Sequence, residues 1–458
     1  HYGRLLNGKP IPESMINVGV STIGPISFIF KLFGVGISQG RIMSVICTIG
    51  SLISLYYLSK FLSNQVIAIA SVLISIFFTL SWTNPIYIGR QALGEMPALF
   101  FLLVGFLFLA ISWDYYLLGV LGATIFWGLS ILSKSQVLPF IIISLILPTI
   151  FCIFKRDTKN LKLYITSLLT LILMIISFRK WLPLFNPNLD PVMQKELFNT
   201  TIFVPILSVR IVSVLNLLIF SIPVIAGTIF VSTHWIKKLN NHNVILNIEL
   251  LKLSLIAFVG GWLIWFALFS NGWSRYLFIP TFIGSIFVAI MLNEFTRRFD
   301  IKYTIENGNN LLRHFKLRKE NLSAIFSIIL FSFYVPLSIN TFFRHMKSIP
   351  DRSFYSVVEF LNTETSRDAI IETYEMELFP FIDRNHHYPP DFVQLQLNRR
   401  FFMGQNVQIE YNPLDADPEY LVVGAKSKEW ELYDDVLEIG EFQLLKSFNE
   451  YDIYKRDR

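Results

Sequence analysis

Long apolar stretches recur along the first three quarters of the chain, separated by short polar segments. Each is about 18 to 25 residues long, the length that a helix needs to cross the roughly 30 Å hydrocarbon core of a bilayer. The stretches predicted as spans are 41–60, 65–83, 95–112, 115–132, 136–154, 161–178, 207–231, 250–270, 274–293 and 322–341. A further apolar segment at 19–37 contains a Gly-Pro pair and Lys31. It is either another span or a helix at the membrane interface.

The tail of the chain, 350–458, changes character. It is rich in charged residues and contains alternating stretches such as YLVVGAKS and EFQLLKSF, with a helical pattern at FYSVVEFLNTE. The predicted fold class is therefore a polytopic α-helical membrane protein of about 10–11 spans with a small C-terminal α/β extramembrane domain. We expect the membrane domain at 1–345 and the extramembrane domain at 346–458.

Composition supports this reading and excludes an ordinary soluble domain. Hydrophobic residues make up 53% of the chain and charged residues 16%, whereas about a quarter of a soluble domain is charged. The net charge of +6 does not indicate nucleic acid, because the basic residues lie in short loops between the spans. Such loops usually report orientation.

If the spans alternate, the most basic loops share one face of the membrane. These loops are 154–162, 234–243 and the long segment that contains Arg297 to Lys319. The positive-inside rule makes that face cytoplasmic. The opposite, external face then receives the N-terminal segment, the loop at 84–94, the turn at 270–275 and the C-terminal domain.

Cysteine and histidine give little support for a metal or disulfide framework. Cys47 and Cys152 both lie inside apolar spans. The stretch RNHHYPPD holds the adjacent residues His386 and His387, which could form a metal pair. Because no carboxylate or cysteine lies at ligand spacing, surface histidines are the favoured interpretation.

Charged and aromatic residues gather in the external loops. The N-terminal segment carries Glu13, and the loop SWTNPIYIGRQALGEMP carries Arg90 and Glu95. Two further turns contain Lys134 and the sequence WSRY at 273–276. These loops come from distant parts of the chain but share one membrane surface, so we expect them to line one cavity.

Three stretches in this order carry a family resemblance: LLNGKPIPES followed by STIGPISFIFKLFG, then GRQALGEMPALFF, then WSRYLFIP. The chain resembles the membrane glycosyltransferases of the GT-C superfamily over most of its length. The likeness is to the branch of the protein O-mannosyltransferases, the lipid A aminoarabinose transferases and the RgtA/B/C/D-like bacterial enzymes. The resemblance implies an inverting hexosyl- or pentosyltransferase that uses a polyprenyl-phosphate-linked sugar donor. The implied acceptor is a lipid, glycan or protein at the external face of a bacterial inner membrane, with membrane lipids as further partners.

The resemblance also implies roles for individual residues. The implied catalytic carboxylates are Glu95 and Glu13, and the implied donor-phosphate-binding groups are Arg90, Arg275, Tyr276 and Lys134. The principal acid of the family would fall immediately before His1, so we expect this chain to be N-terminally truncated and to lack that acid. Some relatives use a divalent metal. No certain cofactor or metal-ligand set is readable here, since His1 and Glu13 have no supporting ligands.

Each candidate also has a simpler interpretation. Glu95 suits the positive end of a helix dipole, a contribution of roughly 0.3–1 kcal/mol, and Arg90 could pair with it or anchor a lipid headgroup. Arg275 and its aromatic neighbours could be interfacial anchors. Lys134 could extend its ammonium to the interface, and Glu13 could be an exposed loop carboxylate.

Two other functions remain open. A transporter or flippase for lipid-linked sugars would place ionisable residues at mid-bilayer and repeat its structure in two halves. A polymerase of the O-antigen type would share the external basic loops but would not require the C-terminal domain. The spans contain few charges and the charged residues collect at one face, so the sequence favours sugar transfer.

Overall fold

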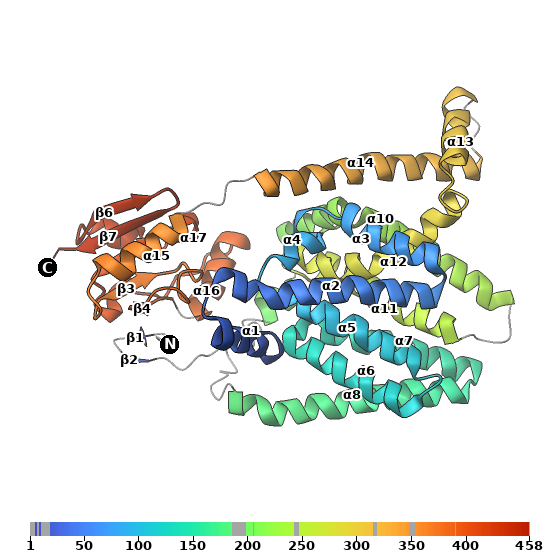
Figure 1. Ribbon diagram of the computed structural model, residues 1–458, viewed down its shortest axis with the longest axis horizontal. Coiled ribbons are helices and arrows are strands. Elements are labelled where there is room, and N and C mark those ends of the chain that lie inside the picture. The colour runs from blue at the N-terminus through green and yellow to red at the C-terminus, as the bar shows by residue number, and fades with distance from the viewer. Residues whose placement is uncertain are drawn as a thin grey trace. The chain divides into compact units, whose positions relative to one another are not determined.

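The computed structural model describes residues 5–6, 9–10, 19–185, 198–204, 206–241, 247–314, 318–347, 353–389 and 391–457. The chain divides into two compact units, which are considered separately (Figure 1). The helical unit comprises Asn17–Lys180 and Leu207–Lys347. The sheet unit comprises His1–Ile16, Trp181–Ile206 and Ser348–Arg458.

The helical unit is built from α-helices. Its helices are α1 (Val20–Phe33), α2 (Ile37–Leu62), α3 (Gln65–Phe77), α4 (Pro85–Gly89), α5 (Glu95–Ile111), α6 (Tyr116–Ser133), α7 (Leu138–Lys155), α8 (Thr158–Phe185, which continues past this unit), α10 (Leu207–Asn241), α11 (Asn247–Leu268), α12 (Phe278–Phe295), α13 (Ile301–His314) and α14 (Lys319–Lys347). Single turns of 3-10 helix are η1 (Ser81–Thr83), η2 (Ser135–Val137) and η4 (Ser274–Leu277).

The predicted membrane-protein fold is confirmed. Among the described residues, eight helices are long and apolar enough to cross a membrane, and three shorter apolar helices, α1, α3 and α5, accompany them. Each apolar stretch found in the sequence corresponds to one of these helices. The predicted span at 65–83 is longer than the helix observed, because α3 ends at Phe77 and the chain then turns through η1.

Side-chain hydrogen bonds hold the loop between α3 and α4. Thr83 accepts a hydrogen bond from the backbone N–H of Leu80 through its side-chain oxygen (3.1 Å). Asn84 caps α4 by accepting from the N–H of Ile86 (2.9 Å), and its amide donates to the carbonyl of Ile76 (2.9 Å). Asn is among the residues preferred at helix N-caps. This loop therefore has a defined course toward α5.

The centre of the helical unit is α12. In the apolar stretch that contains this helix, 89% is buried. It packs against α3, α10 and α11. Gly227 of α10 allows the closest approach, because a Cβ there would lie 2.7 Å from the backbone N of Val288 and 2.8 Å from the carbonyl carbon of Phe287. Close packing of small residues is a usual means of helix association in membranes.

We expect Gly227→Ala to destabilise the helical unit by about 1–3 kcal/mol, because the new methyl group would collide with backbone atoms that have no rotamer to change. The matched control is Gly260→Ala on α11, where no heavy atom lies within 4 Å of the added Cβ. Thermal unfolding of the detergent-solubilised protein would measure both. Equal melting temperatures for Gly227→Ala and the unchanged protein would contradict this account.

The sheet unit contains a five-stranded mixed sheet of order β4-β3-β5-β7-β6. The strands are β3 (Ile370–Thr373), β4 (Asn385–His387), β5 (Tyr420–Val423), β6 (Phe442–Phe448) and β7 (Tyr451–Arg456). Strand β3 pairs in parallel with β4 and with β5. Strand β7 pairs antiparallel with both β5 and β6. The remaining elements are α15 (Ser353–Glu364), α16 (Asp391–Leu397), α17 (Ala425–Glu429), α18 (Asp434–Glu438), the π-helical turns η3 (Phe198–Ile202) and η5 (Asn398–Phe402), the 3-10 turn η6 (Pro413–Ala416), and the hairpin β1 (Leu5–Leu6) and β2 (Lys9–Pro10). The predicted small α/β domain is confirmed.

The interpretation of the two adjacent histidines as surface residues is wrong. His386 is 4% exposed and His387 is fully buried. In the parallel pair of β3 and β4, His387 lies opposite Glu372, and its Nδ1 forms a hydrogen bond with Glu372 Oε2. The sequence around the histidines does not indicate this carboxylate, because Glu372 belongs to a neighbouring strand 15 residues earlier.

Two tyrosines complete this buried cluster. The hydroxyls of Tyr411 and Tyr433 donate to Glu372 Oε1 at 2.5 and 2.9 Å. Burial raises the pKa of Glu372 above its ordinary range, although the hydrogen bonds that it accepts act in the opposite direction. The cluster joins β3, β4 and the segments that carry the tyrosines, so it ties the interior of the sheet unit together.

Candidate active site

Glu95 occupies the first position of α5, directly after its N-cap Gly94. Pro97 lies in the same first turn, where its missing N–H costs nothing. The Glu95 side chain is only 5% exposed. A buried carboxylate needs partners for its charge, and the structure supplies two cations.

The first cation is Lys134, which ends α6 and begins η2. Its ammonium forms an ion pair with Glu95 Oε1 and lies 5.0 Å from the centre of the Tyr276 ring. The contact follows from the hairpin of α5 and α6. These helices have 17 and 18 residues and are joined by a short turn, so the start of one lies level with the end of the other. Ser130 of α6 also donates to the carbonyl of Ala98 (2.7 Å) and fixes this register.

The second cation is Arg275, which lies in η4 at the entrance to α12. Its Nε is 4.0 Å from Glu95 Oε1. Its guanidinium lies 4.7 Å from the Trp273 ring centre and 5.5 Å from that of Tyr276. Stacking on aromatic rings is a favourable setting for a guanidinium. Trp273 and Tyr276 therefore orient the Arg275 guanidinium, in addition to lying near the start of α12.

The turn before η4 is held by hydrogen bonds that the sequence did not reveal. Gly272 adopts a φ of +82°, a conformation that favours glycine. The amide of Asn216 on α10 donates to the Gly272 carbonyl (2.8 Å), and the Gly272 N–H donates to Ser270 Oγ (3.1 Å). Asn216 thus links α10 to the segment that carries Arg275.

The cluster of Glu95, Lys134 and Arg275 has one negative and two positive side chains, so it retains an excess positive charge. Exposure of the side chains increases from 5% at Glu95 to 17% at Lys134 and 32% at Arg275. The carboxylate is innermost and the guanidinium is most accessible. Such an arrangement suits an anion that arrives from outside and meets Arg275 first.

The structure brings four of the six predicted site residues together: Glu95, Lys134, Arg275 and Tyr276. Arg90 is the C-cap of α4 and is exposed. In the described part of the chain the ion-pair partners of Glu95 are Lys134 and Arg275, so the predicted pairing of Arg90 with Glu95 is not formed. Glu13 lies outside the described residues.

Metal ligands were left open by the sequence. Over the described ranges, no three His, Cys, Asp or Glu side chains are grouped closely enough to hold a metal ion. His1 and Glu13, the two candidates named from the sequence, both fall outside those ranges.

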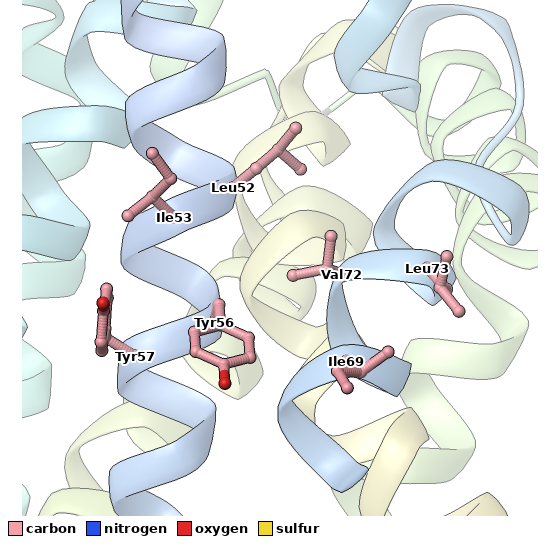
Figure 2. Close-up of a pocket in the computed structure, with 7 residues that line it drawn as sticks. All are labelled: Leu52, Ile53, Tyr56, Tyr57, Ile69, Val72 and Leu73. Carbon is pink, nitrogen blue, oxygen red and sulfur yellow. The ribbon is translucent and has the colours of Figure 1, made fainter. Parts of the chain in front are cut away.

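A separate groove of about 470 Å³ lies between α2 and α3 (Figure 2). Its lining residues are Leu52, Ile53, Tyr56, Tyr57, Ile69, Val72 and Leu73. On α2 they follow Gly50, which packs against the ring of Phe100 in α5, and Phe100 is already five residues beyond Glu95. The groove is therefore displaced along α2 from the charged cluster. All of its lining residues are uncharged.

Comparison with known proteins agrees with this architecture. Residues 25–181 match the family model of dolichyl-phosphate-mannose-protein mannosyltransferases. The matched range contains helices α2 to α7, and with them Glu95 and Lys134 of the cluster. No curated protein sequence matches the chain significantly.

Solved structures extend the likeness over nearly the whole chain. ArnT from Cupriavidus metallidurans bound to undecaprenyl phosphate is similar with a TM-score of 0.62 at 10% identity, covering 96% of this chain and 87% of ArnT. The oligosaccharyltransferase of Archaeoglobus fulgidus in its apo form is similar with a TM-score of 0.55 at 11% identity, covering 97% and 67%. The oligosaccharyltransferase AglB from the same organism, in complex with an inhibitory peptide and a dolichol-phosphate, is similar with a TM-score of 0.53 at 10% identity, covering 97% of this chain and 66% of AglB.

These matches confirm the resemblance predicted from the sequence: the chain has the fold of the GT-C superfamily of membrane glycosyltransferases, with an ArnT-like arrangement of its helices.

Proposed function

We propose that the chain is a glycosyltransferase that moves a sugar from a polyprenyl-phosphate-linked donor to a lipid, glycan or protein acceptor. The single observation that carries the proposal is the cluster of Glu95, Lys134 and Arg275 on a GT-C fold. The family match supports a lipid-phosphate donor, as do the similar structures of ArnT bound to undecaprenyl phosphate and of AglB in complex with a dolichol-phosphate.

The two cations are suited to the donor phosphate. Arg275 directs its Nε toward Glu95, which leaves the two terminal nitrogens of its guanidinium for a bidentate contact with phosphate oxygens. Lys134 has three N–H donors and can contact Glu95 and a phosphate oxygen at once. Both side chains lie at helix ends, the level at which a carrier's phosphate lies when its tail is in the bilayer.

Glu95 is better suited to holding these cations than to acting as the base. A carboxylate that is buried beside an ammonium and a guanidinium is stabilised in its charged form and is correspondingly a weak proton acceptor. We therefore assign it the role of positioning Lys134 and Arg275. This revises the catalytic role that the family resemblance implied for it.

The reaction that these residues serve is a displacement at the anomeric carbon of the donor sugar. The acceptor hydroxyl oxygen forms a bond to that carbon, loses its proton to a base, and the bond from the carbon to the phosphate oxygen breaks. Negative charge grows on the departing polyprenyl phosphate. Arg275 and Lys134 stabilise that charge, which is the type of interaction that accelerates the chemical step. Inversion at the anomeric carbon is the expected outcome.

The positive-inside pattern of the loops supports an external position for the cluster, and the bacterial inner membrane is the expected location. The test is reconstitution of the purified chain in liposomes with radiolabelled hexoses and pentoses linked to polyprenyl phosphate, together with membrane-derived acceptors. Transfer releases unglycosylated polyprenyl phosphate and labels an acceptor. A flippase would instead move the intact donor between leaflets, and this result with no cleavage would overturn the proposal.

We expect Glu95→Gln to lower transfer by at least about tenfold, because Lys134 and Arg275 would lose their shared counter-charge and their fixed positions. Lys134→Met in the same background should restore part of the loss in stability, since it removes one uncompensated cation. A double-mutant cycle on turnover and on melting temperature measures this coupling. Additive effects of the two substitutions would show that the ion pair has no role in positioning.

A further inference from the structure

A second basic region lies at the far end of α12 from the charged cluster. α12 has 18 residues, so its ends are about 27 Å apart and approach opposite membrane faces. After α12 the chain turns through Arg297, Arg298 and Phe299, which all adopt positive φ angles of 47°, 69° and 62°. The turn is held by hydrogen bonds from the N–H of Arg298 to the carbonyl of Asn293 (2.7 Å) and from the N–H of Phe299 to Thr296 Oγ1 (2.9 Å). Both arginine side chains are exposed as a result.

The helix that follows, α13, is strongly amphipathic and packs against α14. Thr304 and Gly308 face α14 and are buried, whereas Ile301 and Ile305 are 74% and 51% exposed. Exposed apolar residues next to a membrane span are typical of a helix that lies in the interface. Lys302, on the same helix, is also exposed.

A groove of about 380 Å³ runs between these two helices. It is lined by Thr296, Phe299, Ile301, Thr304, Ile305, Ile328, Phe331 and Ser332. Ile328 and Phe331 belong to the apolar span of α14 and are 37% and 42% exposed. The groove therefore has an apolar wall on α14. Thr296 and Phe299, which also line it, directly flank the exposed Arg297 and Arg298 in the chain.

We propose that this groove, termed the α13–α14 groove, binds an anionic phospholipid of the bilayer. One acyl chain lies against Ile305, Ile328 and Phe331. The headgroup phosphate and its additional negative charge are contacted by Arg297 and Arg298, with Lys302 nearby. The basic residues favour an anionic ligand. The apolar side chains of α14 favour a lipid over a soluble anion, because a soluble anion would not make apolar contacts with them.

The segment 294–320 contains seven Lys and Arg residues and four carboxylates, so it keeps a formal net charge of +3. The carboxylates are Glu294, Asp300, Glu306 and Glu320, of which Glu294 and Glu320 are exposed at the ends of α12 and α14 that border α13. Asp300 uses a carboxylate oxygen to cap α13, accepting from the N–H of Tyr303 (3.0 Å). Glu306 is exposed one turn after Lys302. The guanidinium of Arg297 lies 4.4 Å from the centre of the Tyr303 ring, which orients it without neutralising it. The exposed side chain of Arg318 lies in a different connection, the one between α13 and α14.

The test is native mass spectrometry of the full chain released from detergent micelles that contain either dioleoylphosphatidylglycerol or dioleoylphosphatidylcholine. The unchanged protein should retain the anionic lipid preferentially. Arg297→Gln with Arg298→Gln should reduce that preference by up to about 25-fold, because each basic side chain at a membrane surface contributes about a fivefold factor. Ile305→Trp, which fills the groove, should reduce retention of the anionic lipid with all charges intact.

Two controls separate this site from general attraction. Lys155→Gln with Arg156→Gln removes two exposed positive charges at the end of α7, on the same membrane face as the groove. Ile69→Trp alters the uncharged α2–α3 groove of Figure 2. Both controls should keep the lipid preference. Equal retention of the two lipids by the unchanged protein, or equal losses in the Lys155/Arg156 control and the Arg297/Arg298 variant, would overturn the proposal.

Discussion

Arg275→Ala is expected to lower sugar transfer by roughly 10²–10³-fold, the usual cost of removing one preorganised electrostatic contact to a transition state. The reason is geometric. Arg275 is the most accessible cation of the cluster, and its guanidinium is oriented by Trp273 and by the nearby carboxylate of Glu95. Initial rates with a polyprenyl-phosphate sugar over a range of concentrations would separate its effects on kcat and KM.

Arg275→Lys is the matched control, because it keeps the charge but removes the planar fork. We expect it to retain activity between that of the unchanged protein and that of Arg275→Ala. A loss that is confined to KM would indicate that the guanidinium binds the donor without stabilising the departing phosphate. Full activity in both variants would exclude Arg275 from the site.

Glu372→Leu is expected to destabilise the sheet unit by about 3–5 kcal/mol, the range seen when one member of a buried charged or hydrogen-bonded network is removed. Tyr411 and Tyr433 would each keep a buried hydroxyl without its acceptor, and His387 would lose its partner across the strands. Glu372→Gln should cost less, since its amide oxygen still accepts a hydrogen bond.

Hydrogen exchange of the backbone amides in β3 and β5, measured in the full chain, reports this local stability without interference from the helical unit. The matched control is Glu429→Leu, which removes an exposed carboxylate paired with Lys426; exposed pairs contribute at most about 1 kcal/mol. Protection of β3 and β5 that is equal in Glu372→Leu and Glu429→Leu would refute the structural role of the buried cluster.

The membrane-spanning architecture was predictable because a single physical requirement determines it. A segment that crosses hydrocarbon must be apolar over about 20 residues, so the lengths of the apolar stretches report the helices directly. The ends were less certain where caps intervene, as after Phe77, where Thr83 and Asn84 redirect the chain before α5.

The charged cluster was only partly predictable. The sequence indicates Glu95, Lys134 and Arg275 as separate candidates, and it suggests Arg90, a neighbour in sequence, as a partner for Glu95. The nearly equal lengths of α5 and α6 contained the signal for the Lys134 contact, because an antiparallel hairpin brings its outer ends together. The approach of Arg275 depends on the packing of α12 among distant helices, which no local pattern encodes.

The contacts of the buried His387 could not be predicted from nearby sequence either. His387 and Glu372 are direct neighbours only through the parallel pairing of β3 and β4. Parallel strands are joined by crossover connections, so the residues that face one another are separated in sequence. Adjacent histidines therefore looked unpartnered in the sequence, although a carboxylate and two tyrosines surround them in the fold.

The order of the cluster along the chain has a consequence for biosynthesis. Glu95 and Lys134 belong to one helical hairpin, so their opposite charges can enter the bilayer together as a neutral pair, which lowers the cost of inserting either alone. Arg275 follows about 140 residues later, which corresponds to roughly 7–28 s at ribosomal speed. The nascent protein therefore carries a balanced pair first and acquires its excess positive charge only when the last spans are delivered.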